Sequence, residues 1–182
     1  KTREFAAASL GHTYGEDTRK APHVTVPHIE GFENLTDLQR YDTAVRAIAE
    51  NAPLRVCPGE LISGAATLGD AIDHLVPVRF EDDPDFRLPG ISHLTVDYGE
   101  VLKIGMNGVE EKIKNSPARF GGERNKAFLK SCAETVKSMR IWHKRYIEKL
   151  CSLSGYEENV KILSKVPFSP AKNFREALQS IW

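Results

Sequence analysis

The feature that most constrains this chain is a long apolar stripe at helical spacing in its second half. The stripe begins near Glu123 and ends near Leu153, where Ser154-Gly155 supplies a helix stop signal. A stripe of this length indicates a long packed helix, so the fold class predicted is mainly α with short extended or β segments. The stripe consists of Leu129, Cys132, Val136, Met139, His143, Tyr146, Ile147 and Leu150.

The N-terminal part divides into an irregular arm and a helix. Residues 1–33 carry three histidines among Gly, Thr and Pro without a sustained apolar period, so we expect an extended arm there. An amphipathic helix is predicted from Asn34, with Asn34 or Thr36 as its N-cap and Asn51-Ala52-Pro53 as its end. We therefore divide the chain into an arm, 1–33, and a helical portion, 34–182.

A second ordered stretch covers 91–116 and carries its own start signal. Asp97 is a candidate N-cap with Glu100 three residues later, where a capping box requires it. Glycines interrupt the apolar face that follows, and they predict a turn near Met106-Asn107-Gly108 that splits the stretch into two helices.

The C-terminal segment ends in a helix that we expect to be cut short. A short helix is predicted near 158–165, followed by an extended segment at 166–172. Asn173 and Glu176 form a capping-box-like start for the final helix. This helix runs for only about two and a half turns without a C-cap, so we expect the helical portion to be truncated at its C-terminus.

The composition excludes two broad classes of partner. The 25 Lys and Arg balance the 25 Asp and Glu, and the pI is about 7.2, so no basic surface for nucleic acid or an anionic membrane is expected. No apolar run approaches the roughly 18 residues needed to span a bilayer. The first residues also lack the pattern of a signal peptide. We therefore expect a cytoplasmic protein that binds neither nucleic acid nor membrane.

Neither the cysteines nor the histidines have the spacing of a metal site. The cysteines form no CxxC pair, which argues against a disulfide framework and a structural zinc site. Cys132 and Cys151 are expected to be small core residues, and Cys57 is the only thiol considered for reactivity, with an inert role favoured. His143 is interpreted as a core or boundary residue. For His74 a structural hydrogen bond is at least as good an interpretation as a role in a site.

One short segment gathers groups that suit substrate binding. Gly90–Tyr98 places an imidazole, hydroxyl groups, a carboxylate and a phenol within nine residues. Such groups can orient a substrate hydroxyl or transfer a proton. For Asp97 a helix cap is the favoured interpretation, whereas for His93 a structural role and a substrate-binding role stay equally open.

Four stretches resemble the glycyl radical enzymes of the pyruvate formate-lyase type. CPGELISG at 57–64 is similar to that family's PxELIxG pattern, and SHLTVDYGEVLKIGMNGVEEKI at 92–113 to its GHxxPDYxxVLxxGLxGLxxEI pattern. KVPFSPAKNFREALQSIW at 165–182 is similar to its VPxxPxxxFxEALQxxWF segment. The residues that follow the family's ER-x-x-F…R-Y-x-x-L helix are Glu123-Arg124, Phe128, Arg145-Tyr146 and Leu150.

Two positions depart from the family pattern. Family members more often read VGN and then an arginine-containing segment where this chain has SGAATLGDAIDHLVPV at 63–78. Ser92 also stands where a glycine is usual before the histidine. Both departures leave the subfamily and its substrate open.

The resemblance implies a fold, a chemistry and one site residue. This chain would be the helical N-terminal part of the glycyl radical enzyme α/β barrel, wrapping it and forming one wall of the site. In that family a glycyl radical near the C-terminus abstracts hydrogen from a mid-chain cysteine, whose thiyl radical attacks the substrate. Neither motif occurs here, so no catalytic residue, metal ligand or bound cofactor is assigned to this chain. His93 matches the histidine that helps bind the substrate hydroxyl in dehydratase-like members.

The parent enzyme implied is a lyase of anaerobic metabolism that cleaves a C–O, C–N or C–C bond of a small molecule. This chain would be inactive alone, and a radical-SAM activase would install the radical in the parent enzyme. An isolated wrapping segment should also expose apolar surface and so associate with further copies. Two alternatives stay open: a formate acetyltransferase-type acyltransferase, and a non-catalytic helical interaction module.

Overall fold

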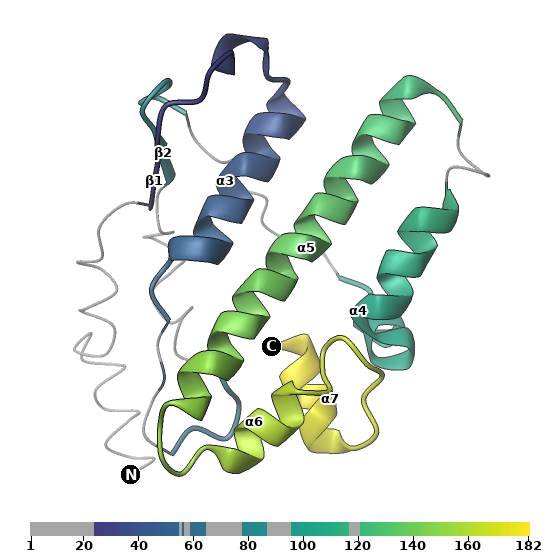
Figure 1. Cartoon of the computed structure of the whole chain (residues 1–182). Coiled ribbons are helices and arrows are strands. Elements are labelled where there is room, and N and C mark those ends of the chain that lie inside the picture. Colours follow the sequence, from purple (N-terminus) through teal and green to yellow (C-terminus); the bar gives the residue numbers. More distant parts are fainter. Residues whose placement is uncertain (1–23, 55, 57–58, 65–77, 87–95, 117–120) are drawn as a thin grey trace.

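The computed structural model describes residues 24–54, 56, 59–64, 78–86, 96–116 and 121–182 (Figure 1). The interpretations of Cys57, His74 and His93 lie outside these residues, as does most of the predicted arm. The described part is mainly helical with two short strands, which confirms the predicted fold class. Its elements are β1 Val24–Val26, the 3-10 helix η1 Phe32–Asn34, α3 Asp37–Asn51, β2 Val78–Phe80, α4 Tyr98–Asn115, α5 Glu123–Cys151, α6 Glu157–Leu163 and α7 Phe174–Ile181.

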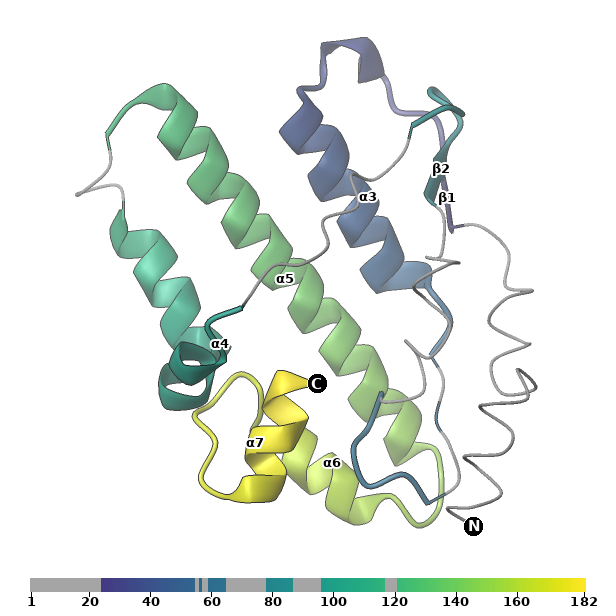
Figure 2. The same ribbon diagram turned by 180° about the vertical axis from the view of Figure 1, so that it is seen from behind.

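The long helix α5 is the axis on which the other helices assemble. α3 lies along one side of it and α4 along the other, as both views show (Figures 1 and 2). α6 packs against α5, and α7 contacts both α6 and α4. The predicted helix is confirmed, and Val136, Tyr146 and Leu150 of its stripe are buried.

Two side chains of α5 do not take the core positions expected of them. Met139 is exposed although it belongs to the predicted stripe. The prediction that Cys151 is a core residue is wrong, because its side chain is exposed. Leu150 occupies the core position, and the next residue of a helix points about 100° away from it. Cys132 is half-buried, and burial raises the pKa of its thiol.

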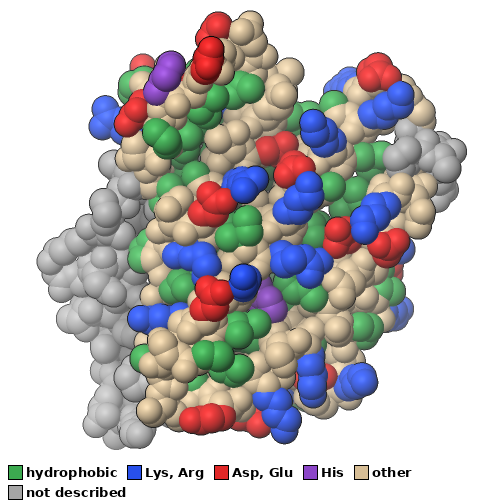
Figure 3. Space-filling model, in the orientation of Figure 1, with side chains coloured by type: hydrophobic (Ala, Val, Ile, Leu, Met, Phe, Trp, Pro, Cys, Tyr) green, Lys and Arg blue, Asp and Glu red, His purple; other side chains and the backbone are tan. Residues whose placement is uncertain are grey.

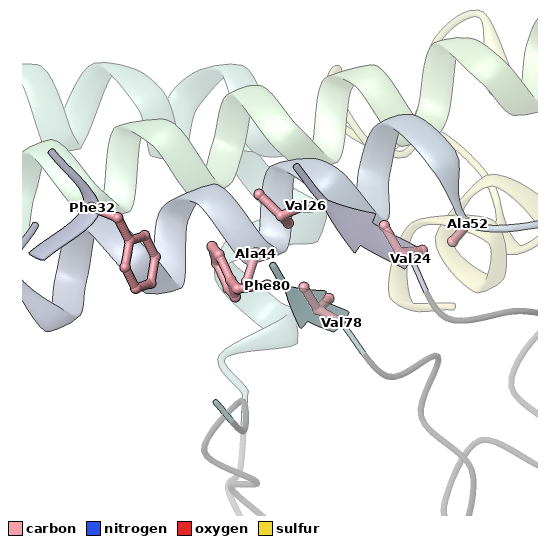
Figure 4. Close-up of a cluster of buried hydrophobic side chains, with 7 residues drawn as sticks. All are labelled: Val24, Val26, Phe32, Ala44, Ala52, Val78 and Phe80. Atoms are coloured by element: carbon pink, nitrogen blue, oxygen red, sulfur yellow. The ribbon is translucent and has the colours of Figure 1, made fainter. Parts of the chain in front are cut away.

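A parallel pair of strands closes one side of α3. β1 and β2 pair in register, with Val24 opposite Val78 and Val26 opposite Phe80. Alternate residues of both strands point into one core (Figure 4). Phe80 is fully buried there between Phe32 and Phe86, at ring centroid distances of 5.3 and 4.8 Å. The buried residues of this cluster are Val24, Val26, Phe32, Ala44, Ala52, Val78 and Phe80. The end of the predicted arm is therefore part of a core, while the division of the chain at residue 33 stays a prediction.

The helix starts follow the capping chemistry expected from the sequence. Thr36, and not Asn34, caps α3: its Oγ1 accepts from Gln39 N, and the Gln39 side chain accepts in return from Thr36 N at 2.9 Å. Asp97 caps α4 by accepting from Glu100 N at 3.0 Å. α3 ends at Asn51 before Pro53, as predicted.

The predicted break in α4 is present, one residue before the predicted turn. Gly105 has φ 66° and ψ 173°, a conformation that is essentially restricted to glycine. The break turns Met106 N and Asn107 N toward the carbonyl oxygens of Pro167 and Phe168, at 2.9 and 3.1 Å. A Cβ at Gly105 would lie 2.6 Å from Phe168 O, so only glycine permits this approach of two backbones.

The segment after α6 differs from the extended conformation predicted for 166–172. Residues 164–168 form successive turns, and residues 170–172 belong to neither a helix nor a strand. Val166 N donates to Ile162 O, and Ser169 N donates to Lys165 O at 2.7 Å. These turns present the carbonyl groups that the bent part of α4 contacts.

Charges of both signs are interspersed over the face of the molecule that Figure 3 shows. Many pair along one helix, such as Arg46 with Glu50 at 2.8 Å and Lys137 with Glu134 at 2.7 Å. Within the described ranges, no helix is long and apolar enough to cross a membrane.

We predict that Gly105→Ala destabilises the chain much more than Gly155→Ala does. Both glycines have positive φ, but a Cβ at Gly155 would meet nothing within 4 Å. Gly155→Ala should therefore cost about 1–2 kcal/mol for the backbone conformation alone. Gly105→Ala should cost about 1–3 kcal/mol more because of the overlap with Phe168. Urea denaturation of both variants measures the difference, and equal losses would contradict the close approach.

Candidate functional site

Two groups of described residues lie next in sequence to segments outside the described part, and one of these segments contains His93. His93 itself lies outside the described residues, so its substrate-binding role stays a prediction. Glu60–Gly64 immediately precedes the segment 65–77, and Val96 and Asp97 follow the segment 87–95. The contacts of these flanking residues define the candidate site.

The side-chain amide of Gln179 clamps the backbone of Ser63. Ser63 N donates to Gln179 Oε1 at 2.8 Å, and Gln179 Nε2 donates to Ser63 O at 3.0 Å. Both residues are buried. An amide suits this position because it offers one donor and one acceptor to a single peptide unit. The clamp joins residues that are 116 positions apart in the sequence.

Two further side chains hold the same loop. Asn159 Nδ2 donates to Ser63 Oγ at 2.9 Å and to Glu60 O at 3.3 Å, and Asn159 is also buried. Arg175 Nη2 lies 3.4 Å from Leu61 O. The loop is therefore fixed by groups from both α6 and α7, through hydrogen bonds that are mostly shielded from water.

Glu176 anchors α7 from the other side. Its carboxylate accepts from Lys172 N at 2.8 Å and lies 3.3 Å from Lys165 Nζ, while its own N–H donates to Asn173 Oδ1. The hydrogen bond from Lys172 N is the main reason that the pKa of Glu176 is lowered, and Lys165 adds to it. The predicted start of α7 at Asn173 is confirmed, although the Glu176 carboxylate bonds Lys172 N and not the N–H of the cap residue.

The Arg145-Tyr146 pair of α5 serves the packing of this region. The guanidinium of Arg145 donates to Ala49 O at 2.8 Å and to Ala52 O at 2.7 Å, so it satisfies carbonyl groups at the end of α3. Burial lowers the pKa of Arg145. Tyr146 is buried, and its ring lies beneath Gly64, at 3.7 Å from where a Cβ would stand.

His143 has the structural role expected of it. Its Nε2 lies 3.1 Å from Val166 O, and its ring packs on Phe168 at 5.1 Å between centroids. Burial lowers the pKa of His143, so the neutral imidazole is favoured. It therefore helps to fix the turns that support α4.

This arrangement positions segments and does not itself supply a reaction. No group of three or more His, Cys, Asp or Glu suited to a metal ion occurs among the described residues. What the described residues offer is a set of hydrogen bonds that hold the backbone at Ser63 and at the start of α4 in place. Sequence reasoning missed Ser63, Asn159 and Gln179. The available signal was the pair of motifs ELISG and EALQ, each with a polar residue in an apolar setting.

Comparison with known proteins identifies the family. The pyruvate formate lyase-like family model matches residues 84–182, which is more than half of the chain. This chain belongs to the pyruvate formate lyase-like family. The resemblance to glycyl radical enzymes found in the sequence is confirmed. No curated protein sequence matches the chain.

Two solved structures share the fold. One is a protein of 1,2-propanediol dehydration from Roseburia inulinivorans, with a TM-score of 0.63, 18% identity, and coverage of 95% of this chain and 32% of its own. The other is the glycerol-bound B12-independent glycerol dehydratase from Clostridium butyricum, with a TM-score of 0.63, 19% identity, and coverage of 94% and 32%. The pyruvate formate lyase-like chain described here thus spans about a third of the length of these structures.

We predict that Gln179→Glu destabilises the chain at neutral pH and that acid relieves the loss. The ionised carboxylate keeps the acceptor for Ser63 N but faces Ser63 O without a donor, which should cost about 2–4 kcal/mol. Burial raises the pKa of the new carboxyl above its usual value of about 4.3, so the folded state binds the proton more tightly than the unfolded state. Stability relative to wild type should therefore rise as the pH falls toward 5.

The matched control is Gln39→Glu in the capping box of α3. Gln39 Oε1 only accepts, from Thr36 N and Oγ1, so a carboxylate serves there as well as an amide. Urea denaturation at pH 7.5 and pH 5 compares both variants with wild type. A pH-independent loss at Gln179 would contradict the two-way hydrogen bond.

Proposed function

We propose that this chain is part of a glycyl radical lyase of the dehydratase type and holds one wall of a site for a small hydroxylated molecule. The observation that carries the proposal is the mutual packing of the segments that resemble this family. ELISG is clamped by Gln179 of EALQ, and the bend at Gly105 is docked on the VPF turn. Because these motifs pack on one another, they support the fold of the glycyl radical enzymes. That fold in turn supports a substrate site like the one in that family.

The contribution of this chain is positioning. The radical chemistry would come from the cysteine and glycine segments of the parent enzyme, and the chain alone is inactive. Its own residues hold the backbone at Ser63 and at Asp97, which are close in sequence to the segments 65–77 and 87–95. A wall held in this way supports catalysis by orienting a substrate.

His93 binds the substrate hydroxyl in this proposal. It lies four residues before Asp97, whose carboxylate caps α4 by accepting from Glu100 N. α4 is in turn bent onto Phe168, so the start of α4 at Asp97 has a defined position. An imidazole near this point suits a hydrogen bond to a neutral hydroxyl group.

The dehydratase type is favoured over an acyltransferase by a single consideration. Both fold neighbours described above are proteins of diol or triol dehydration. Their low identity supports the fold directly and the reaction only by analogy. No described residue gives comparable support to an acyltransferase or to a non-catalytic interaction module.

The test uses the full product of the gene that encodes this sequence. Purified without oxygen and treated with a radical-SAM activase and S-adenosylmethionine, it should give a glycyl radical signal in electron paramagnetic resonance. It should then convert 1,2-propanediol or glycerol to the aldehyde, whereas the 182-residue chain should do neither. A radical without dehydration of either polyol, together with acyl transfer from pyruvate to coenzyme A, would establish the acyltransferase instead.

A second prediction concerns His93. In the same protein, His93→Ala should lower kcat/KM for the polyol by tenfold or more, because roughly 1–3 kcal/mol is lost when a substrate hydroxyl has no partner. The glycyl radical yield should be unchanged. His28→Ala is the control, since this histidine is exposed and its Nδ1 bonds the carboxylate of Asp82. Unchanged kcat/KM in the His93 variant would exclude the binding role.

A further inference from the structure

The last helix carries an apolar face that is only partly covered, in which Leu178 is 37% and Ile181 is 38% exposed. Within α7 the exposed residues are Phe174, Leu178 and Ile181, and the buried residues are Glu176 and Gln179. Phe174 has 78% of its surface exposed, and Trp182, which follows the helix, has 59%. The spacing of 174, 178, 181 and 182 places these side chains on one face. A surface helix normally directs its apolar face inward, whereas α7 directs polar residues inward and apolar residues outward.

The inward hydrogen bonds prevent α7 from rotating to bury this face. A rotation would break both Gln179–Ser63 hydrogen bonds and leave Ser63 N–H and C=O without their partners in a dry environment. It would also separate Glu176 from Lys172 N and Lys165 Nζ. Arg175, the other charged residue of α7, is half-buried and directed toward Leu61 O. The outward face is thus uncharged and fixed in place.

We infer that this face, formed by Phe174, Leu178, Ile181 and Trp182, is a docking surface for the remaining polypeptide of the parent enzyme. The inference rests on the proposed function. The fold neighbours match nearly all of this chain, yet the match takes up only 32% of each of them. The family match also continues through α7 to residue 182, so this helix belongs to the shared fold. An uncharged aromatic and aliphatic face requires an apolar partner surface of the kind found in a protein interior.

The experiment compares the 182-residue chain with the full product of its gene by hydrogen exchange. Peptides covering α7 should exchange at least tenfold more slowly in the longer protein, because a covered helix opens less often. No substrate or activase is added. A full-length protein with a protected α7 and no activity would therefore overturn the proposed function alone.

Substitution of the face provides the second readout. Phe174→Ser should leave the Tm of the 182-residue chain within about 2 °C of wild type and lower that of the longer protein by about 5 °C or more. The matched control is Phe174→Leu, which keeps an apolar side chain at the same position and should change neither.

Two outcomes would overturn the inference. One is equal exchange of α7 in both proteins, or a gene product no longer than the chain itself. The other is a dimer of the 182-residue chain that Phe174→Ser abolishes while α7 stays unprotected in the longer protein, which would assign the face to a second copy.

Discussion

The two hydrogen bonds between the Gln179 amide and the Ser63 peptide fix how α7 meets the Glu60–Gly64 loop of the N-terminal half. They are buried, they use both the donor and the acceptor of one side chain, and they connect points 116 residues apart. Everything on the outward face of α7 follows from them, because a helix that directs Gln179 inward must direct the residues opposite outward. The sequence distance also matters, since the clamp can form only after α5 and α6 have returned the chain to the Glu60–Gly64 loop.

The segments that identify the family contact one another, and their described residues have structural roles. The glycine of KIGMN is needed because a backbone passes where its side chain would be, and the partner backbone is the VPF turn. The arginine of the RY pair satisfies carbonyl groups at the end of α3. A motif built from such contacts indicates a fold with great specificity and says little about the reaction, which depends on segments beyond these contacts.

The parts of the fold that were predictable from sequence are those set by local chemistry. Thr36, Asp97 and Asn173 were recognisable as caps because a cap depends on residues within one turn. The long stripe of α5 was recognisable because its period persists over many turns. The pairing of Val24–Val26 with Val78–Phe80 was not, because three residues are too few to display an alternation and the partners lie more than fifty positions apart. The Ser63 clamp was not predictable for the same reason.

The case of α7 shows why periodicity alone cannot assign a helix face to the inside. Its apolar residues recur at helical spacing, so the pattern predicts a helix with two different faces. Which face points inward depends on the free energy of the groups that would otherwise lose their partners, and here Glu176 and Gln179 have specific buried partners whereas Phe174 has none in the described part. Turning Gln179 outward would leave Ser63 N–H and C=O buried without partners, which costs more than leaving one phenylalanine in water. An inverted helix of this kind therefore leaves its apolar face uncovered in the chain, and this is the face that we propose as a docking surface.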